Sequence, residues 1–169
     1  MAQDRLGLFR PYLKEVVREL KHLLGVALTS VVVFGSVARG EAREGSDIDL
    51  LVESERFKGT LPRRFKVFSE IDRRLSRSPG ARIIRGRGLS TLVSPVTLTP
   101  EEVKSNPPIL LDVLTDGVIL YDEGNFISGH LNQLKAKLEA LGARRVTLPS
   151  GKWYWDLNPD HKLGESVEI

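Results

Sequence analysis

The chain has 169 residues, of which 41% are hydrophobic and 28% charged, and its formal net charge is +3. This length accommodates one domain, or one domain with a small appendage. The absence of cysteine excludes a disulfide framework and a thiolate metal site. Because no run approaches the roughly 18 apolar residues that cross a membrane, we expect a soluble cytoplasmic protein without membrane contact.

The first predicted element is an amphipathic helix over residues 4–24. Its apolar residues recur at steps of three and four, which places them on one helical face: Phe9, Leu13, Val16, Leu20, Leu23 and Leu24. Pro11 is expected in the first turn, and Gly25 is expected to end the helix. We expect the apolar face of this helix to pack on a sheet.

The next stretch predicts a strand, a tight turn and a second strand. The β-branched run Val31–Phe34 suits a buried strand, which Gly35 then breaks. Ser36 is expected to cap a short helical turn over residues 37–39. A glycine-containing loop leads from this turn to the second strand, predicted over residues 47–53.

Two carboxylates stand at alternate positions of the second strand. Because side chains on a strand alternate between its faces, Asp47 and Asp49 project from the same face. The two groups repel each other unless a divalent cation lies between them, and Mg²⁺ prefers hard oxygen ligands of this kind. Gly35 lets the backbone approach a ligand closely, and Ser36 adds a hydroxyl. These residue types suit a site for Mg²⁺ and a nucleotide phosphate.

The same residues resemble a known signature. It consists of three short motifs, Gly35-Ser36, Ala38-Arg39-Gly40 and Ser46-Asp47-Ile48-Asp49-Leu50. The pattern resembles the DNA polymerase β-like nucleotidyltransferases, and most closely their minimal nucleotidyltransferase group. The resemblance is specific over residues 28–55 and looser over residues 1–100. It implies an α/β nucleotidyltransferase fold, in which a short mixed sheet carries helices on one face and leaves the acidic face open.

The resemblance also implies a reaction and the residues that carry it. A nucleoside monophosphate would pass from a nucleoside triphosphate, with ATP preferred, to a hydroxyl acceptor, and pyrophosphate would leave. Asp47 and Asp49 would be the catalytic residues and would hold one or two Mg²⁺ ions. The phosphates would be bound by Gly35, Ser36, Arg39, Arg43 and Ser46. The acceptor stays open between a protein, a nucleic acid and a small molecule.

A basic block follows the second strand. A second amphipathic helix is predicted over residues 61–77, and residues 81–88 suit either a short edge strand or a mobile loop. From Arg56 to Arg87 the chain carries eleven Lys or Arg residues against two acidic residues. The block is either a solvated helix face with a basic loop or a surface for a polyanionic partner.

A third strand is predicted over residues 89–98, where apolar and polar residues alternate. Pro95 indicates that this strand bends or lies at a sheet edge. In the family that the sequence resembles, a third carboxylate usually lies on this strand, beside the first two. Between Asp72 and Glu101 this sequence contains no acidic residue. The remaining candidates for that role are Glu53, Glu101 and Glu102.

None of the three candidates fits the role well. Glu53 has the right strand parity but lies about 13 Å from Asp47 at roughly 3.3 Å per residue, too far for a shared metal. The two glutamates after Thr99 fit a capping box at a helix start. Another class of function therefore stays open: a catalytically weak or inactive nucleotide-binding module, similar to antitoxins that pair with a helical toxin. A nucleic-acid-binding accessory protein is a further alternative.

The last third of the chain predicts helices, a strand and a hairpin. A short helix begins at Thr99, two prolines interrupt it, and residues 109–114 continue it. A strand is predicted over residues 118–121, a helix that Asn125 caps over residues 126–141, and a hairpin over residues 144–157. Two aspartates in this part, Asp112 and Asp116, are interpreted as surface and turn residues.

These patterns predict a nucleotidyltransferase core over residues 1–98 and an appendage of helices and a β-hairpin over residues 99–169, ending in a polar tail. The appendage carries more apolar residues than so small a segment usually buries, among them Ile109, Leu110, Leu111, Trp153 and Trp155. We therefore expect a homodimer that buries this surface, whereas a partner protein is what the resemblance to antitoxins implies.

Overall fold

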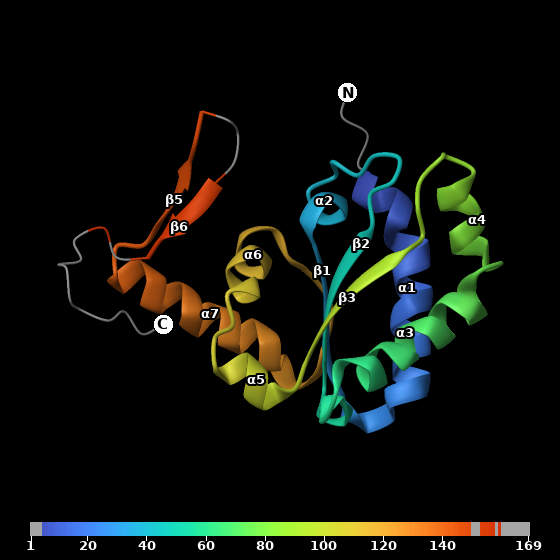
Figure 1. The fold of residues 1–169 in the computed structure, drawn as a ribbon, viewed down its shortest axis with the longest axis horizontal. Helices are drawn as coiled ribbons and strands as arrows, with labels where there is room; N and C mark the ends of the chain where they lie inside the picture. Colours follow the sequence, from blue (N-terminus) through green and yellow to red (C-terminus); the bar gives the residue numbers. More distant parts are fainter. Residues whose placement is uncertain (1–4, 150–152, 158, 160–169) are drawn as a thin grey trace. The chain divides into compact units, whose positions relative to one another are not determined.

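The computed structural model describes residues 5–149, 153–157 and 159. The chain forms two compact units, residues 1–127 and residues 128–169, and Figure 1 shows the elements of both. Among the described residues, no helix is both long and apolar enough to cross a membrane. The division between core and appendage at residues 98 and 99 stays a prediction.

A four-stranded sheet forms the centre of the first unit, with strand order β3-β2-β1-β4. The strands are β1 (Leu28–Phe34), β2 (Ile48–Ser54), β3 (Val93–Leu98) and β4 (Val118–Asp122). β1 is antiparallel to both β2 and β4, whereas β2 and β3 are parallel. The predicted mixed sheet is therefore confirmed, and β3, which contains Pro95, lies at an edge of it.

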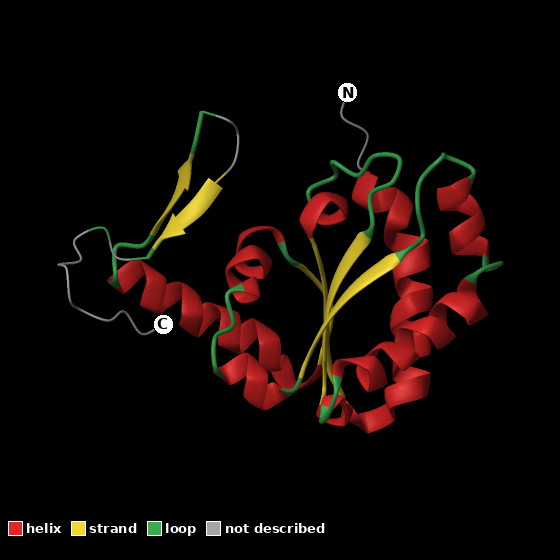
Figure 2. Cartoon of the chain, in the orientation of Figure 1, coloured by secondary structure: helices red, strands yellow, loops and turns green. Residues whose placement is uncertain are grey.

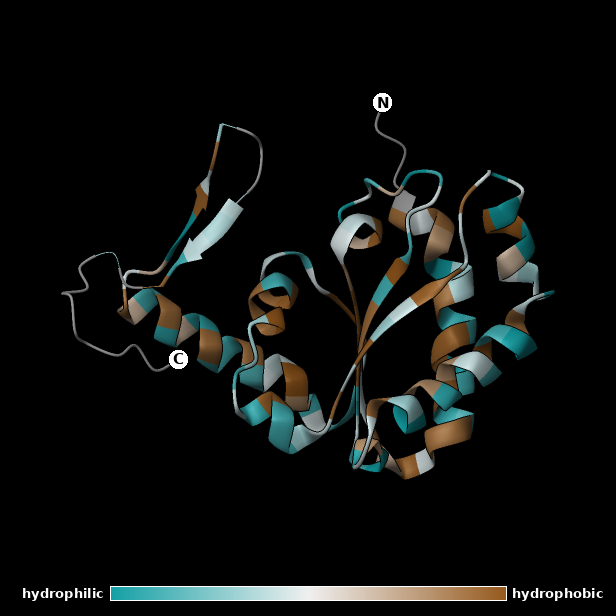
Figure 3. Ribbon diagram, viewed as in Figure 1, coloured by the Kyte–Doolittle hydropathy of each residue, from teal (hydrophilic) through white to brown (hydrophobic). Residues whose placement is uncertain are grey.

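Three helices cover one face of the sheet, as Figure 2 shows: α1 (Arg5–Leu24), α3 (Leu61–Leu75) and α4 (Pro79–Arg85). Alternate residues of the two central strands point to this side, so Val31 and Val33 join Leu50 and Val52 in the main hydrophobic core. Hydrophobic segments, brown in Figure 3, follow the strands and alternate with hydrophilic ones along the helices. The predicted helix face is confirmed over Arg5–Leu24, and residue 4 lies outside the described residues.

Two short helices lie against the other face. α5 (Pro100–Lys104) lies beside β3, and α6 (Ile109–Asp116) lies beside β1 and α2 (Gly35–Ala38). Val32, Phe34 and Leu51, which point to this side, are buried. The prediction that the acidic face stays open is therefore wrong for most of it, because these apolar side chains need cover. The end of this face around Asp49 remains partly exposed.

Several local predictions are wrong. Pro11 lies inside α1 rather than in its first turn. Residues 79–85 form α4 instead of a strand or loop, because Ser78 caps the helix by accepting from the Ala81 N–H at 3.1 Å, and a proline follows it. The hydroxyl of Ser36 does not cap α2, since that helix already begins at Gly35.

Other predicted boundaries are confirmed. α1 ends before Gly25, and Thr99 and Glu102 form the predicted capping box at the start of α5. Glu102 also pairs with Arg64, whose two terminal nitrogens lie 2.8 Å from its two carboxylate oxygens. Short 3₁₀ turns complete this unit at Gly25–Ala27, Glu55–Phe57 and Glu123–Asn125.

The second unit contains a helix and a hairpin. α7 (Phe126–Ala140) begins at the end of the first unit, and its Ile127 N–H donates to Asp122 Oδ1 at 2.9 Å. β5 (Arg144–Thr147) and β6 (Trp153–Asp156) pair antiparallel, which confirms the predicted hairpin. Most of the polar tail lies outside the described residues. The homodimer stays a prediction.

Candidate active site

The turn after β1 is built on a glycine that no other residue could replace without strain. Gly35 has φ +68°, a conformation that L side chains rarely adopt. A Cβ atom built on it would lie 2.3 Å from Asp49 Oδ2. The Asp49 carboxylate therefore lies directly against the backbone at the start of α2, which brings together the glycine turn and the acidic strand that the sequence singled out.

Asp49 lies near the start of β2, paired with Phe34 of β1 and Ser94 of β3. Its side chain is half-buried. Burial raises the pKa of the Asp49 carboxyl, the nearby charge of Asp47 raises it further, and Arg39 lowers it. Asp47 is exposed and precedes β2 by one residue. The two predicted carboxylates are thus close enough to interact.

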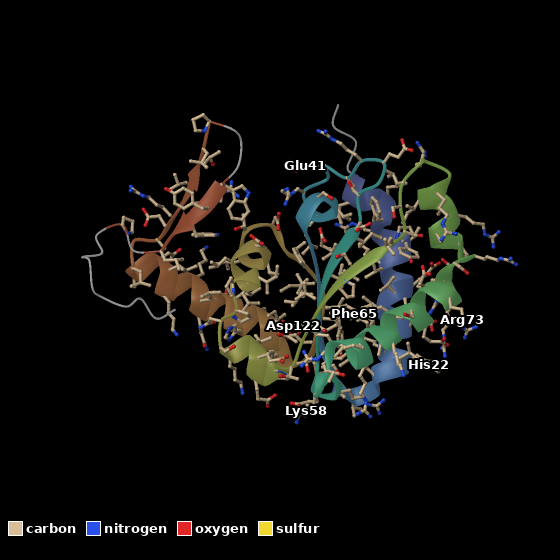
Figure 4. All side chains as sticks on the ribbon, in the orientation of Figure 1. His22, Glu41, Lys58, Phe65, Arg73 and Asp122 are labelled. Carbon is tan, nitrogen blue, oxygen red and sulfur yellow. The ribbon has the colours of Figure 1, made fainter. Side chains whose placement is uncertain are left out.

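Arg39 follows α2 and contacts two carboxylates. Its Nε lies 2.8 Å from Glu41 Oε2, and its Nη1 donates to Asp116 Oδ2. Both hydrogen bonds raise the pKa of the guanidinium. Figure 4 shows Glu41 in the loop after α2, at the same end of the sheet. Arg39 is therefore a cation held by Glu41 and Asp116, and its charge acts on Asp49.

Asp116 is the site residue that the sequence analysis missed. It is the last residue of α6, and its Oδ1 accepts from the Gly35 N–H at 3.4 Å although 81 positions separate the two residues. Its charge also raises the pKa of Asp49 and that of Asp112, one turn earlier on α6. Only the pairing of β4 with β1 brings this aspartate to the site, and strand order cannot be read from local sequence.

Two predicted phosphate-binding residues instead contact each other. The Arg43 N–H donates to Ser46 Oγ at 2.9 Å, and the Ser46 N–H donates to the Arg43 carbonyl at 3.0 Å. Both contacts stabilise the loop between α2 and β2. The Arg43 side chain is exposed, and Ser46 is half-buried. These contacts do not test whether the two residues bind phosphate, so that role stays a prediction.

The third carboxylate expected from the resemblance is not on β3. Ser94 occupies the β3 position paired with Asp49. Of the three candidates, Glu102 pairs with Arg64 and Glu101 is exposed on α5, whereas Glu53 lies at the far end of β2, opposite Ser30.

The donor set fits a divalent cation that completes its coordination with substrate. Among the described residues, no group of three or more metal-ligating side chains is assembled. Asp47 and Asp49 nevertheless provide two interacting carboxylates, and the Asp49 carboxylate occupies the space that a Cβ on Gly35 would fill. Mg²⁺ commonly binds through one or two carboxylates together with waters and substrate phosphates. These residues therefore suit such an ion when a nucleotide is bound.

Comparison with known proteins points to one family. Residues 13–84 match the family model described as nucleotidyltransferase domain. A protein of Methanocaldococcus jannaschii, whose name gives protein adenylyltransferase as its proposed activity, is 35% identical over 126 residues. That match covers 73% of this chain and 78% of the relative.

The chain is also similar to solved structures, at lower sequence identity. A complex described as a toxin–antitoxin with AMP-PNP contains a chain that is 18% identical, with a TM-score of 0.48 and coverage of 75% of this chain and 92% of that one. A proposed nucleotidyltransferase from Sulfolobus solfataricus is 20% identical, with a TM-score of 0.45 and coverage of 72% and 89%.

Proposed function

The chain belongs to the nucleotidyltransferase family, and from this premise we propose that it transfers AMP from Mg²⁺-bound ATP to a hydroxyl group of another protein. The resemblance noted in the sequence is confirmed at the level of the family, and the chain is an enzyme of the nucleotidyltransferase class. The observation that carries the proposal is the contact between the Gly35 backbone and the Asp49 carboxylate.

Asp47 and Asp49 would hold the metal ion in this proposal. A divalent cation at such a site neutralises phosphate charge and stabilises the attacking and leaving oxygens. Asp49 is well placed because it is half-buried and fixed by strand pairing on both sides. Asp47, which is exposed in the loop before β2, would be the second ligand, since its charge already acts on Asp49. The mutual repulsion that raises the pKa of Asp49 would be relieved by the cation.

The triphosphate would lie over the start of α2. The Gly35 N–H and the Ser36 hydroxyl would donate to phosphate oxygens, and the Arg39 guanidinium would add positive charge. The hydroxyl oxygen of the acceptor forms a bond to the α-phosphorus while the bond between the α-phosphorus and its bridging oxygen breaks. Pyrophosphate leaves, and the hydroxyl proton passes to water. Most of the catalysis would then come from positioning and charge stabilisation.

A protein acceptor is favoured by the M. jannaschii relative, whose name specifies protein adenylylation. A catalytically weak or inactive member of this enzyme class, which binds nucleotide as an interaction module, is the second candidate, because Ser94 stands where the resemblance places a third carboxylate. The two candidates differ in a single respect, since only the enzyme moves AMP onto another molecule.

The experiment uses ATP labelled at either the α- or the γ-phosphate, with Mg²⁺ and a heat-treated cell extract, which supplies acceptor proteins while its own kinases are inactivated. Adenylyl transfer predicts that protein acquires the α label but not the γ label, and that the Asp49→Asn variant transfers neither. Tight ATP binding without any α-label transfer would favour the inactive module. Transfer of the γ label would contradict both candidates.

A further inference from the structure

The Asp116 carboxylate binds two hydrogen-bond donors, the Gly35 N–H and the Arg39 guanidinium, that the proposed function assigns to the triphosphate. Asp116 accepts from the Gly35 N–H through Oδ1, at 3.4 Å, and from Arg39 Nη1 through Oδ2. Resting on that proposed function, we propose that Asp116 is a placeholder: its carboxylate occupies the phosphate subsite in the nucleotide-free protein and yields it to the triphosphate.

The position of Asp116 is unfavourable without these two contacts. It ends α6, where the partial negative charge of the helix C-terminus opposes a carboxylate. Asp112, one turn earlier, adds a second negative charge beside it. The Asp116 side chain is only 13% exposed, so water compensates little of this cost. Arg39 and the Gly35 N–H therefore supply the compensation, and any anion that competes for them destabilises Asp116 in its present place.

Arg39 can exchange its contact with Asp116 while it keeps its contact with Glu41, because different nitrogens make the two contacts. Its Nε lies 2.8 Å from Glu41 Oε2, whereas Nη1 faces Asp116. A guanidinium carries five N–H donors in a planar fork, so phosphate can replace Asp116 while Glu41 keeps the group in position.

The backbone at Asp116 need not move in this exchange. The Gly117 N–H donates to the Val113 carbonyl at 2.8 Å and holds the end of α6, and β4 begins one residue later. Rotation of the Asp116 side chain alone would free both donors. The same rotation removes a negative charge from the space near Asp49, where its presence already raises the pKa of that carboxyl.

The test measures ATP binding by calorimetry in EDTA, so that the Asp116 charge is not offset by a metal ion. Asp116→Asn should bind ATP about two- to fivefold more tightly than the wild type, because a partly buried competing ion pair is removed. Asp112→Asn is the matched control, because it removes the same charge one turn earlier on α6, from a carboxylate that acts on Arg39 through its charge alone. Its gain should be clearly smaller.

Two further variants make the outcome decisive. Arg39→Gln combined with Asp116→Asn should abolish the gain, because the freed donor is lost. Asp116→Ser, which removes the charge with a shorter side chain, gives a second measurement should the asparagine variant fold poorly. Unchanged or weaker binding by both folded Asp116 variants would overturn the placeholder role, as would an equal gain in Asp112→Asn.

The wild type with Mg²⁺ separates this inference from the proposed function. If the wild type binds Mg²⁺-ATP and the Asp116 variants gain nothing in EDTA, only the placeholder role is wrong. If neither the wild type nor the Asp116 variants bind ATP with or without Mg²⁺, the proposed function fails and the placeholder role fails with it.

Discussion

Asp49 and Glu53 lie four residues apart on the same face of β2, yet their surroundings differ. Asp49 is half-buried at the end of the sheet, beside Arg39 and the Gly35 backbone. Glu53 is completely buried, and within the described part of the chain neither of its carboxylate oxygens has a hydrogen-bond partner. Burial raises the pKa of Glu53 to about 7, and the nearby charge of Asp122 contributes to this increase.

The two carboxylates differ in whether they can bind a metal ion or only destabilise the fold. A metal-binding carboxylate must be ionised and reachable by substrate, and Asp49 has both a nearby cation and partial access to solvent. Glu53 has neither, because the ionised form of a buried, unpaired carboxyl is strongly disfavoured. Identical chemical changes at the two positions should therefore affect different properties of the protein.

The largest difference is expected in activity. Asp49→Asn keeps the side-chain shape but removes the charge, so α-label transfer should fall by at least about a thousandfold, the scale of a lost charge-stabilising group. Glu53→Gln makes the same change at the buried position and should retain transfer within about a fewfold. Comparable losses in both variants would show that access to the site does not distinguish the two acids.

Glu53 should matter more than Asp49 for the pH dependence of stability. The pKa of Glu53 is raised from 4.5 to about 7 in the folded state, so its carboxyl is protonated in both states below the lower value and costs nothing there. As pH rises through this window, the unfolded chain loses the proton first, and the free energy of unfolding should fall by about 3 kcal/mol.

Urea unfolding at pH 4.5 and pH 8 measures this effect as the difference between the wild type and Glu53→Gln. The variant lacks the titrating group, so its free energy of unfolding should fall between the two pH values by about 3 kcal/mol less than that of the wild type. Parallel curves for the two proteins would mean that Glu53 does not carry the shift.

The glycine contact should matter for transfer beyond its backbone strain. Gly35→Ala places a Cβ against Asp49 Oδ2, whereas Gly45→Ala, also at positive φ, meets nothing within 4 Å. Both should lose about 1–2 kcal/mol of stability from the left-handed backbone. Transfer should fall at least about tenfold in Gly35→Ala alone, because only that variant displaces the carboxylate. Equal transfer by both variants would contradict the close contact.

The smallest expected effect is a gain. Ser94 pairs with Asp49 across β2 and β3, on the same face. Ser94→Asp would add the missing carboxylate beside the acceptor, and as a general base it should raise α-label transfer by about tenfold. Ser94→Asn is the neutral control of the same size. A gain in both variants, or in neither, would argue against a proton-accepting role at this position.

Much of the candidate site could be predicted because its signals are local. The glycine turn, the short helix and the two aspartates lie within one stretch of chain, and strand alternation alone relates Asp47 to Asp49. Asp116 could not be found this way, since an aspartate before a glycine is typical of any turn. Its role depends on β4 lying beside β1, a long-range pairing that periodicity does not reveal.

The fold was predictable to a similar extent and for a similar reason. Helix periodicity located α1 and α3, whereas α4 was missed because seven residues contain too few turns to show a period. The helices α5 and α6 on the acidic face could not be predicted, because local sequence does not show that Val32, Phe34 and Leu51 share one face of the sheet. That follows only from the strand order. Elements that depend on one segment were predicted, and contacts between distant segments were not.

Calorimetry of ATP binding with and without Mg²⁺ is the most direct test of a metal site at Asp47 and Asp49, because it requires no acceptor. It compares the wild type with an Asp47→Ala/Asp49→Ala double variant and with Glu53→Gln. We expect Mg²⁺ to strengthen ATP binding by the wild type and by Glu53→Gln, and we expect the double variant to lose this Mg²⁺-dependent gain. Absence of binding by the wild type, or an undiminished Mg²⁺ effect in the double variant, would contradict this expectation.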